Sequence, residues 1–146
     1  MGLSSKLQYK SWDLGFSMRA SLGNYVYNNV AAGGMNVGAG SVYTLGFLGN
    51  RQYDAVNRGF TNPAEQQYYS DYFVENASFL KLDNVTLGYS FDKIWDANIS
   101  GRIYATVQNV MTITNYTGID PEVAGGIGGD MYPRPITTIV GLTLNF

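Results

Sequence analysis

"WDLGFSMRASL", residues Trp12 to Leu22, alternates apolar and polar side chains without interruption. Successive side chains of a β-strand point to opposite faces of a sheet, so this pattern predicts a strand with one apolar and one polar face. Its eleven residues also match the roughly 9–11 that a tilted strand needs to cross a bilayer. The stretch therefore predicts a sheet whose apolar side meets an apolar phase.

Similar alternation recurs along the chain and gives five predicted strands. They lie near residues 2–9, 12–22, 79–91, 98–110 and 136–146. Residues 10–11 and 92–97 are short turns, whereas residues 23–78 and 111–135 are long connections, and no segment has a convincing helical period. Short turns at one end and long loops at the other are typical of outer-membrane barrels. An all-β, antiparallel transmembrane barrel fragment with two long extracellular loops is therefore predicted.

The alternation shifts by one residue within the third strand. Leu80 and Leu82 lie on one parity and Val85 on the other. An extra residue in one strand of a pair shifts its alternation in this way. A β-bulge or a strand start is therefore predicted near Asp83 and Asn84.

The composition limits the chemistry that the chain can perform. Charged residues are 14% and aromatic residues 14% of 146 residues, the net charge is -2, and the chain contains no Cys and no His. Because the sequence has no basic patch, nucleic acid is not expected as a partner. Without imidazoles, thiols or a clustered acid pair at a strand end, no enzyme and no cofactor are expected.

Aromatic residues gather beside the short turns and at the chain end. They are Tyr9, Trp12, Phe91, Trp95 and Phe146. Aromatic rings at the membrane–water boundary form girdles on outer-membrane barrels. Tyr9, Trp12, Phe91 and Trp95 are therefore predicted interfacial residues.

Five strands are too few to close a barrel, and an open edge cannot face hydrocarbon with unpaired backbone groups. The chain is therefore interpreted as part of a larger barrel. One alternative is a small soluble β-sandwich that binds carbohydrate through a Tyr-rich loop and buries the apolar face of residues 12–22. Another is a structural fragment that associates with other chains through its open edge strands.

The long connection after residue 22 is rich in aromatic side chains. The candidate ligand-binding residues are Tyr53, Phe60, Tyr68, Tyr69 and Tyr72. Aromatic faces stack on sugar rings and on peptide side chains, so this loop is a candidate contact for cargo or for a partner protein. The alternative is that these rings pack the loop against itself.

Three acidic residues near the second long connection are candidate calcium ligands, because Ca²⁺ prefers oxygen ligands. They are Asp120, Glu122 and Asp130. Their spacing lacks the regular pattern of a calcium loop, so no metal site is predicted. A turn is the simpler interpretation, since Asp accepts hydrogen bonds from nearby backbone amides and Pro121 fixes its own backbone angle.

The last strand resembles the assembly signal of Gram-negative barrels, a polar residue and a glycine followed by apolar residues and a terminal aromatic. Gly141, Leu144 and Phe146 match that pattern, whereas Ile139 stands where a polar residue is expected. These three residues are the predicted assembly signal.

Three longer stretches resemble one family in particular. They are "SDYFVENASFLKLDNVTLGYSF" from Ser70 to Phe91, "QNVMTITNYTGIDPEV" from Gln108 to Val123, and "YPRPITTIVGLTLNF" from Tyr132 to Phe146. In this order they resemble the C-terminal region of the SusC-like TonB-dependent outer-membrane receptors, which import glycans or peptides.

The resemblance implies a barrel of roughly 22 strands around a plug domain, with these five strands the last and the C-terminus periplasmic. The plug domain would be absent from this chain, and contact with the TonB complex would occur through the missing N-terminal part. Other implied partners are a SusD-like surface lipoprotein, outer-membrane lipid and an oligosaccharide or peptide cargo. Arg19 and Arg102 would point into the lumen, where carboxylates of the plug are candidate partners.

Overall fold

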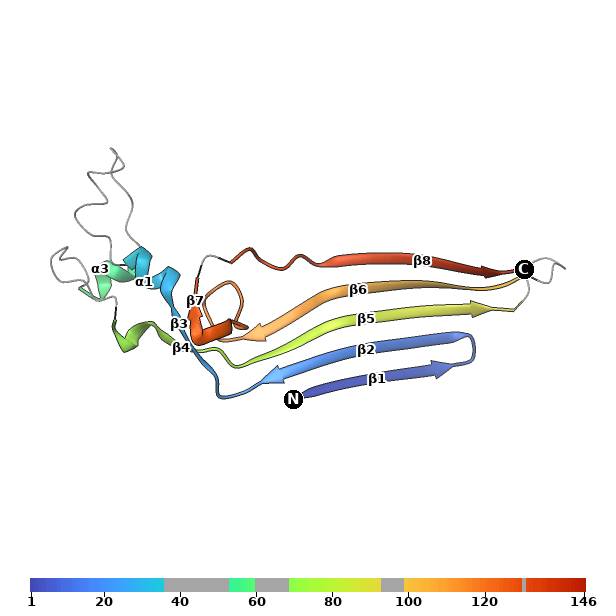
Figure 1. Ribbon diagram of the computed structural model, residues 1–146, viewed down its shortest axis with the longest axis horizontal. Coiled ribbons are helices and arrows are strands. Elements are labelled where there is room, and N and C mark those ends of the chain that lie inside the picture. Colours follow the sequence, from blue (N-terminus) through green and yellow to red (C-terminus); the bar gives the residue numbers. More distant parts are fainter. Residues whose placement is uncertain (36–52, 60–68, 93–98, 130) are drawn as a thin grey trace, which may run out of the picture. The chain divides into compact units, whose positions relative to one another are not determined.

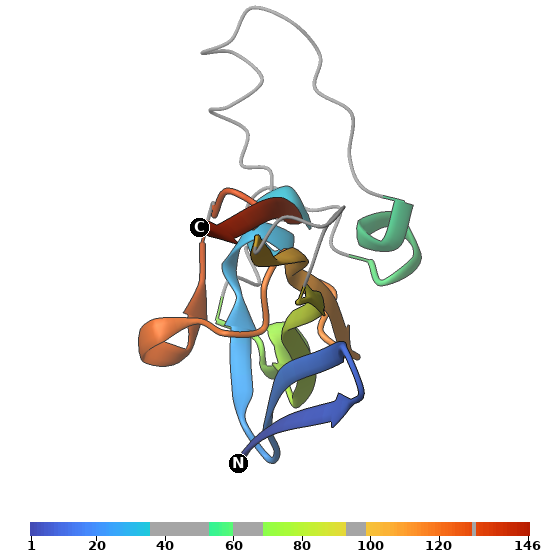
Figure 2. The same cartoon turned by 90° about the vertical axis from the view of Figure 1, so that its right-hand side faces the viewer.

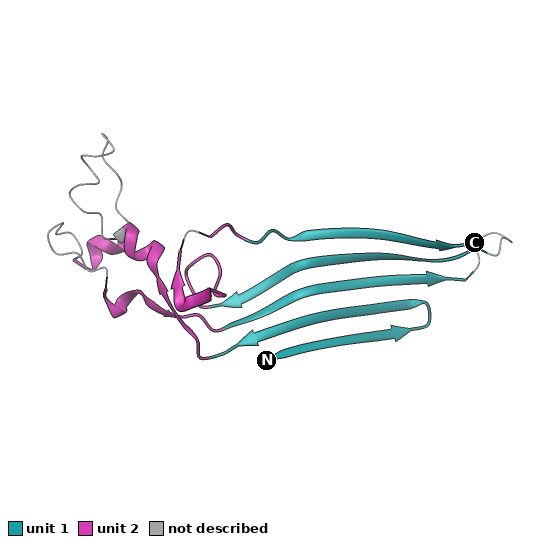
Figure 3. Cartoon of the chain, in the orientation of Figure 1, with its two compact units in different colours: residues 1–22, 79–114, 134–146 teal, residues 23–78, 115–133 magenta. Residues whose placement is uncertain are grey.

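The computed structural model describes residues 1–35, 53–59, 69–92, 99–129 and 131–146. The chain divides into two compact units, coloured separately in Figure 3. Unit 1 comprises Met1–Leu22, Phe79–Thr114 and Arg134–Phe146, and unit 2 comprises Gly23–Ser78 and Asn115–Pro133. Within the described ranges, no helix is both long enough and apolar enough to cross a membrane.

Unit 1 is a single five-stranded antiparallel sheet with the order β1-β2-β5-β6-β8 (Figure 1). Its strands are β1 Gly2–Tyr9, β2 Trp12–Ser21, β5 Phe79–Phe91, β6 Ser100–Thr114 and β8 Thr137–Asn145. The β1–β2 hairpin and β8 lie at opposite edges of the sheet, as Figure 2 also shows. The turn between β1 and β2 has two residues, and Lys10 adopts a φ of 53° there, which fits the primed turns that join twisted strands.

The predicted bulge in the third strand is confirmed. Ser17 of β2 pairs with Asn84 and Met18 pairs with Leu82, so Asp83 is an extra residue on β5. This extra residue returns Leu82 to the same face as the apolar residues beyond the bulge. A second irregularity follows in β6, where Asn109 has a φ of 54°. Strand β6 continues beyond this irregularity to Thr114, past the predicted end at residue 110.

Cross-strand pairs show that one face of the sheet is apolar across all five strands. For example, Leu7 pairs with Leu14, Leu14 with Leu87, and Leu87 with Ala105, which in turn pairs with Val140. Paired residues point to the same side of a sheet, so these side chains form one continuous surface. That surface is exposed: 57% of Leu7, 47% of Leu87 and 70% of Val140 are accessible.

Unit 2 contains short elements where the sequence predicted long loops. They are β3 Tyr25–Asn28, α1 Asn29–Met35, α3 Tyr53–Asn57, the 3-10 helix η1 Asp71–Phe73, β4 Val74–Asn76, the 3-10 helix η2 Ala124–Gly126 and β7 Ile127–Gly128. Strand β3 pairs antiparallel with β4 and parallel with β7. Because β7 comes from the second connection and β3 from the first, the two connections fold together. Helices of seven and five residues are too short to show a helical period in the sequence.

Two small clusters form the core of unit 2. Ala32, Ala55 and Phe73 make up the first. Val26, Ala77 and Tyr116 make up the second. Phe73 has only 1% of its surface exposed, so it is the largest fully buried side chain of the described residues. Both buried apolar clusters thus belong to unit 2, whereas in the sheet of unit 1 Phe79 alone of the described apolar residues is buried.

Candidate functional site

A pocket of about 500 Å³ lies in unit 2. Its lining includes Asn28, Asp54, Tyr72, Glu75, Thr117 and Asp120. These residues come from both long connections, so the pocket exists only when both are folded. Its walls combine carboxylates, an aromatic ring and apolar side chains, which are the groups that bind a polar organic ligand in proteins.

Glu75 joins the two connections at the wall of this pocket. Its Oε2 accepts a hydrogen bond from the backbone N–H of Thr117 at 2.7 Å, and its Oε1 accepts one from the Thr117 hydroxyl at 2.7 Å. The Asn28 amide donates to the same Oε1 at 2.9 Å. Asn28 Oδ1 in turn accepts from the backbone N–H of Ala31, which caps the start of α1. One carboxylate therefore connects β4, the end of β3 and residue 117.

Tyr116 forms the buried side of the same region, with 7% of its surface exposed. Burial, followed by the negative charge of Glu75, raises the pKa of the Tyr116 phenol above its ordinary value. A side chain at Gly118 or Gly128 would collide with the Tyr116 ring or hydroxyl. Glycine is thus required at both positions for the backbone to approach this ring.

Among the aromatic residues predicted to bind ligand, Tyr72 lines the pocket. The Tyr72 ring packs edge-on against Phe73, with 5.2 Å between ring centroids, and the Arg58 guanidinium lies 4.8 Å from its centroid. Tyr53 and Tyr69 do not line the pocket and are largely exposed. Phe60 and Tyr68 lie outside the described residues.

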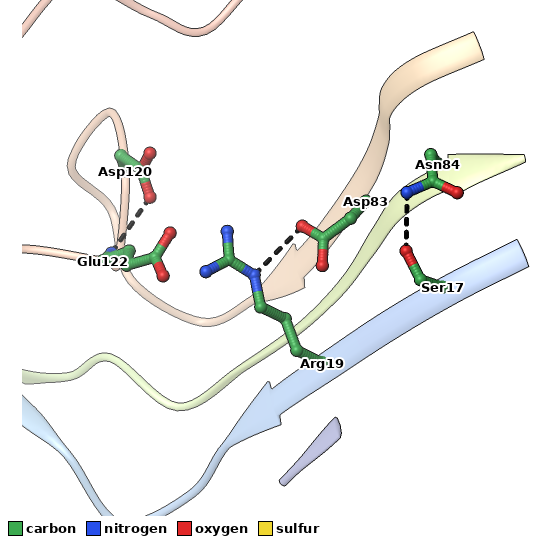
Figure 4. A network of polar contacts seen from close by, with 6 residues as sticks. All are labelled: Ser17, Arg19, Asp83, Asn84, Asp120 and Glu122. Atoms are coloured by element: carbon green, nitrogen blue, oxygen red, sulfur yellow. Dashed lines mark hydrogen bonds and ion pairs between the residues drawn. The ribbon is translucent and has the colours of Figure 1, made fainter. Parts of the chain in front are cut away.

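The candidate calcium ligands take part in a turn. Asp120 is buried, and its Oδ1 accepts a hydrogen bond from the backbone N–H of Glu122 at 3.0 Å (Figure 4). This is the bond that the turn interpretation predicted for the Asp-Pro sequence. Asp130 lies outside the described residues. The described parts of the chain contain no group of three or more acidic residues placed to hold a metal ion.

The polar face of unit 1 carries a network of ion pairs and hydrogen bonds. The Arg102 guanidinium donates to both carboxylate oxygens of Asp13, at 2.9 and 2.6 Å. These residues lie on β6 and β2, with β5 between them, and a side chain at Gly88 of β5 would collide with both. Arg19 pairs with Asp83 at 3.0 Å (Figure 4). Both arginines therefore have carboxylate partners within the sheet, where the sequence suggested partners from a plug domain.

Hydroxyl and amide groups continue this network on the same face. Asn84 donates to the Ser17 hydroxyl at 2.7 Å (Figure 4). The hydroxyls of Thr86 and Thr106 are 2.8 Å apart. Each of these bonds joins neighbouring strands, so the polar face holds the strands in register by side-chain contacts as well as by the backbone ladder.

The predicted assembly-signal residues lie along β8 and at its end. Gly141 pairs with Tyr104, and the Tyr104 ring occupies the space that a side chain at Gly141 would need. Leu144 pairs with Gly101 and is 40% exposed, while Phe146 is 95% exposed. The structure thus gives Gly141 a packing role that the sequence did not indicate.

The predicted interfacial aromatics lie at the hairpin end of the sheet. Tyr9 and Trp12 form the last pair before the β1–β2 turn, and the Trp12 ring contacts that of Tyr89 with 4.8 Å between centroids. Phe91, at the end of β5, packs over Gly101. Trp95 lies outside the described residues.

Sequence reasoning missed Asn28, Glu75 and Thr117. Glu75 and Thr117 are 42 positions apart, and Asn28 and Thr117 are 89 apart. A contact between residues so distant leaves no local pattern. Glu75 and Thr117 lie within two of the stretches that resemble the receptor family, but that resemblance assigned neither of them a role.

Comparisons with known proteins give a consistent result. No protein-family profile matches the sequence. The TonB-dependent receptor SusC of Bacteroides thetaiotaomicron is 46% identical over 150 residues, covering 100% of this chain, which matches its C-terminal part. The TonB-dependent receptor P3 of Formosa agariphila is 24% identical over 163 residues, again covering 100% of the chain. The chain spans only 15% and 16% of the lengths of these two relatives.

Solved structures share the fold. The RagAB peptide transporter matches 99% of the chain with a TM-score of 0.76 and 24% identity, and the chain covers 17% of that protein. The RagAB peptide importer in its closed-closed state matches with a TM-score of 0.75, also at 24% identity. The relatives and neighbours are named as receptors and transporters, not as enzymes.

Proposed function

Because the chain belongs to the SusC-like TonB-dependent receptors, which are β-barrel transporters of the outer membrane, we propose that it supplies the last strands and two surface connections of a nutrient-importing barrel. In this proposal the complete barrel has roughly 22 strands. The C-terminus and the short turns lie on the periplasmic side, and unit 2 lies at the cell surface.

The observation that carries this proposal is the exposed apolar face that continues across all five strands of unit 1. A surface of this kind is stable against hydrocarbon and costly against water. The opposite face carries ion pairs and hydroxyls and suits a hydrated or plug-filled lumen. Neither β1 nor β8 has a partner strand on its outer edge among the described residues, so both edges are available for pairing with the rest of a barrel.

A soluble sandwich requires the apolar face of the sheet to be buried. It would bury the apolar face of residues 12–22, whereas Trp12 is 50% and Leu22 is 75% exposed. The barrel proposal accounts for the exposed tryptophan at the hairpin as an interfacial residue.

The cargo in this proposal is an oligomeric nutrient, either a glycan or a peptide, and unit 2 provides part of its binding site. Tyr72 offers a ring for stacking, while the Asp54 carboxylate offers a hydrogen-bond acceptor in the pocket. A SusD-like lipoprotein covers the surface connections, and the TonB complex acts through parts of the receptor outside this chain. The chemistry is binding and conformational release, with no covalent step.

Uptake by the intact receptor tests this function. Cells that lack the receptor gene are complemented with wild-type receptor or with Tyr72→Ala, and growth is measured on mixed oligosaccharides or on mixed oligopeptides as the carbon source. Growth on one source should require the receptor, and Tyr72→Ala should weaken binding of that cargo to the purified receptor about tenfold, by about 1.4 kcal/mol. Tyr69→Ala, at an exposed tyrosine outside the pocket, is the matched control. Receptor-independent growth on both sources would contradict the proposed uptake of these cargoes.

A further inference from the structure

The apolar face of unit 1 contains a groove of about 280 Å³. Its lining includes Trp12, Leu87, Tyr89, Ile103, Ala105 and Val140. Ala105 pairs with Leu87 on one side and Val140 on the other. Because its methyl group is much smaller than these two neighbours, the surface is hollowed at Ala105. The groove is continuous with the exposed apolar face described above.

One end of this groove is bounded by aromatic rings near a positive charge. Trp12 and Tyr89 contact each other there, and Trp12 pairs across the hairpin with Tyr9. The Lys10 ammonium lies 5.4 Å from the centroid of the Tyr9 ring. Aromatic rings beside a lysine at the end of an apolar surface lie where phosphate headgroups lie in a membrane.

We propose that this groove and Lys10 bind one phospholipid, with an acyl chain in the groove and the phosphate at the Lys10 ammonium. This proposal rests on the proposed function, because the apolar face must meet the bilayer. One premise and one observation favour a lipid over another occupant. In the proposed barrel the groove continues the surface that meets hydrocarbon. The observed Lys10 charge beyond its aromatic end is complementary to a phosphate.

Native mass spectrometry of the intact receptor tests the acyl-chain half of the site. Delipidated receptor in detergent is titrated with dioleoylphosphatidylglycerol. Wild type should bind one lipid, and Ala105→Leu, which fills the floor of the groove, should weaken that binding at least tenfold. Ala20→Leu is the matched control, because Ala20 lies on the same apolar face, paired with Leu80, but outside the groove. Equal lipid binding by the two folded variants would overturn the proposal.

A second variant tests the headgroup and does not disturb the sheet. Wild type should bind dioleoylphosphatidylglycerol about fivefold more tightly than dioleoylglycerol, which has the same chains without a phosphate. Lys10→Gln should remove this preference and leave dioleoylglycerol binding unchanged. A preference that persists in Lys10→Gln would refute the headgroup site, and a lipid-free dimer of wild-type receptor would show a second copy as the occupant.

Failure of the lipid site can be distinguished from failure of the proposed function. A receptor that imports cargo but binds no phospholipid would refute only the lipid site. Absence of the receptor from outer-membrane fractions would remove the premise of both proposals.

Discussion

The two units of this chain place their apolar side chains in opposite ways. Unit 2 buries Phe73 and two small clusters inside itself, as a domain in water does. Unit 1 is a sheet whose apolar residues point outward and are exposed over all five strands. Unit 2 therefore supplies its own apolar interior, whereas unit 1 depends on an apolar phase around it. Substitutions that separate these two sources of stability test the comparison.

The largest expected effect is in the core of unit 2. Phe73→Ala should destabilise this unit by about 3–5 kcal/mol, because it removes a fully buried ring and leaves a cavity. Hydrogen exchange on the intact receptor should show loss of protection in β3, β4 and β7 while the strands of unit 1 stay protected. Tyr69→Ala, at a fully exposed position, is the control. Equal loss of protection in unit 1 would show that the units are not separate.

A charge on the outer face of unit 1 should have the next largest effect. Leu87→Lys should destabilise the folded receptor by about 2–4 kcal/mol, because the lysine would have to enter hydrocarbon. Thr86→Lys places the same charge one residue away on the polar face and should cost much less. Urea titrations of receptor in lipid vesicles measure both. A soluble environment for this face would instead make the Leu87 variant the milder of the two.

Weakening the contact between the two long connections should have an intermediate effect on the stability of unit 2. Glu75→Gln keeps the shape of the side chain but replaces one carboxylate oxygen by an amide donor, so at least one of the bonds from Thr117 is lost. The expected cost is about 1–3 kcal/mol. Faster hydrogen exchange at Thr117 and in β3, measured on the receptor, would report it. Asp71→Asn, at an exposed acidic residue outside the pocket, is the control. Identical exchange in both variants would contradict the proposed role of Glu75 in joining the two connections.

An effect of similar size separates the two possible roles of Gly141. Gly141→Ala should cost about 1–3 kcal/mol through overpacking against Tyr104. If packing is its role, the double variant with Tyr104→Ala should recover much of that loss, and the difference in a double-mutant cycle measures the coupling. If Gly141 is read during assembly, the double variant should still insert poorly into membranes in cells.

The smallest effect at neutral pH is expected from Tyr116. The pKa of its phenol is raised above 10.0 in the folded state, so folding favours the neutral phenol. The stability that depends on neutral Tyr116 is fully present below the unfolded pKa near 10 and is lost as pH rises through the higher folded value. Exchange in unit 2 should accelerate in that range, and Tyr116→Phe should abolish this step. A step that persists in the Phe variant would have to come from another group.

The fold of unit 1 was more predictable from the sequence than the fold of unit 2. Alternation in a strand is local, so the face assignments and the bulge near Asp83 followed from neighbouring residues. The short helices of unit 2 did not, because their few residues carry no periodic signal. The pocket was predicted in part: Tyr72 was a candidate because it is aromatic, but Glu75 and Thr117 were not, since their contact spans 42 positions.

The sequence alone determined the two-faced character of the strands, the position of the turn at residues 10–11 and the resemblance to an outer-membrane receptor family. The turn predicted at residues 92–97 lies outside the described residues from residue 93 onward. These properties depend on residue type and on spacing within a strand. Only the tertiary structure decided that Arg102 pairs with Asp13 across Gly88, that Tyr104 lies over Gly141, and that the two long connections share one pocket. Such contacts join residues far apart in the chain, and their geometry is fixed only when the strands and connections have come together.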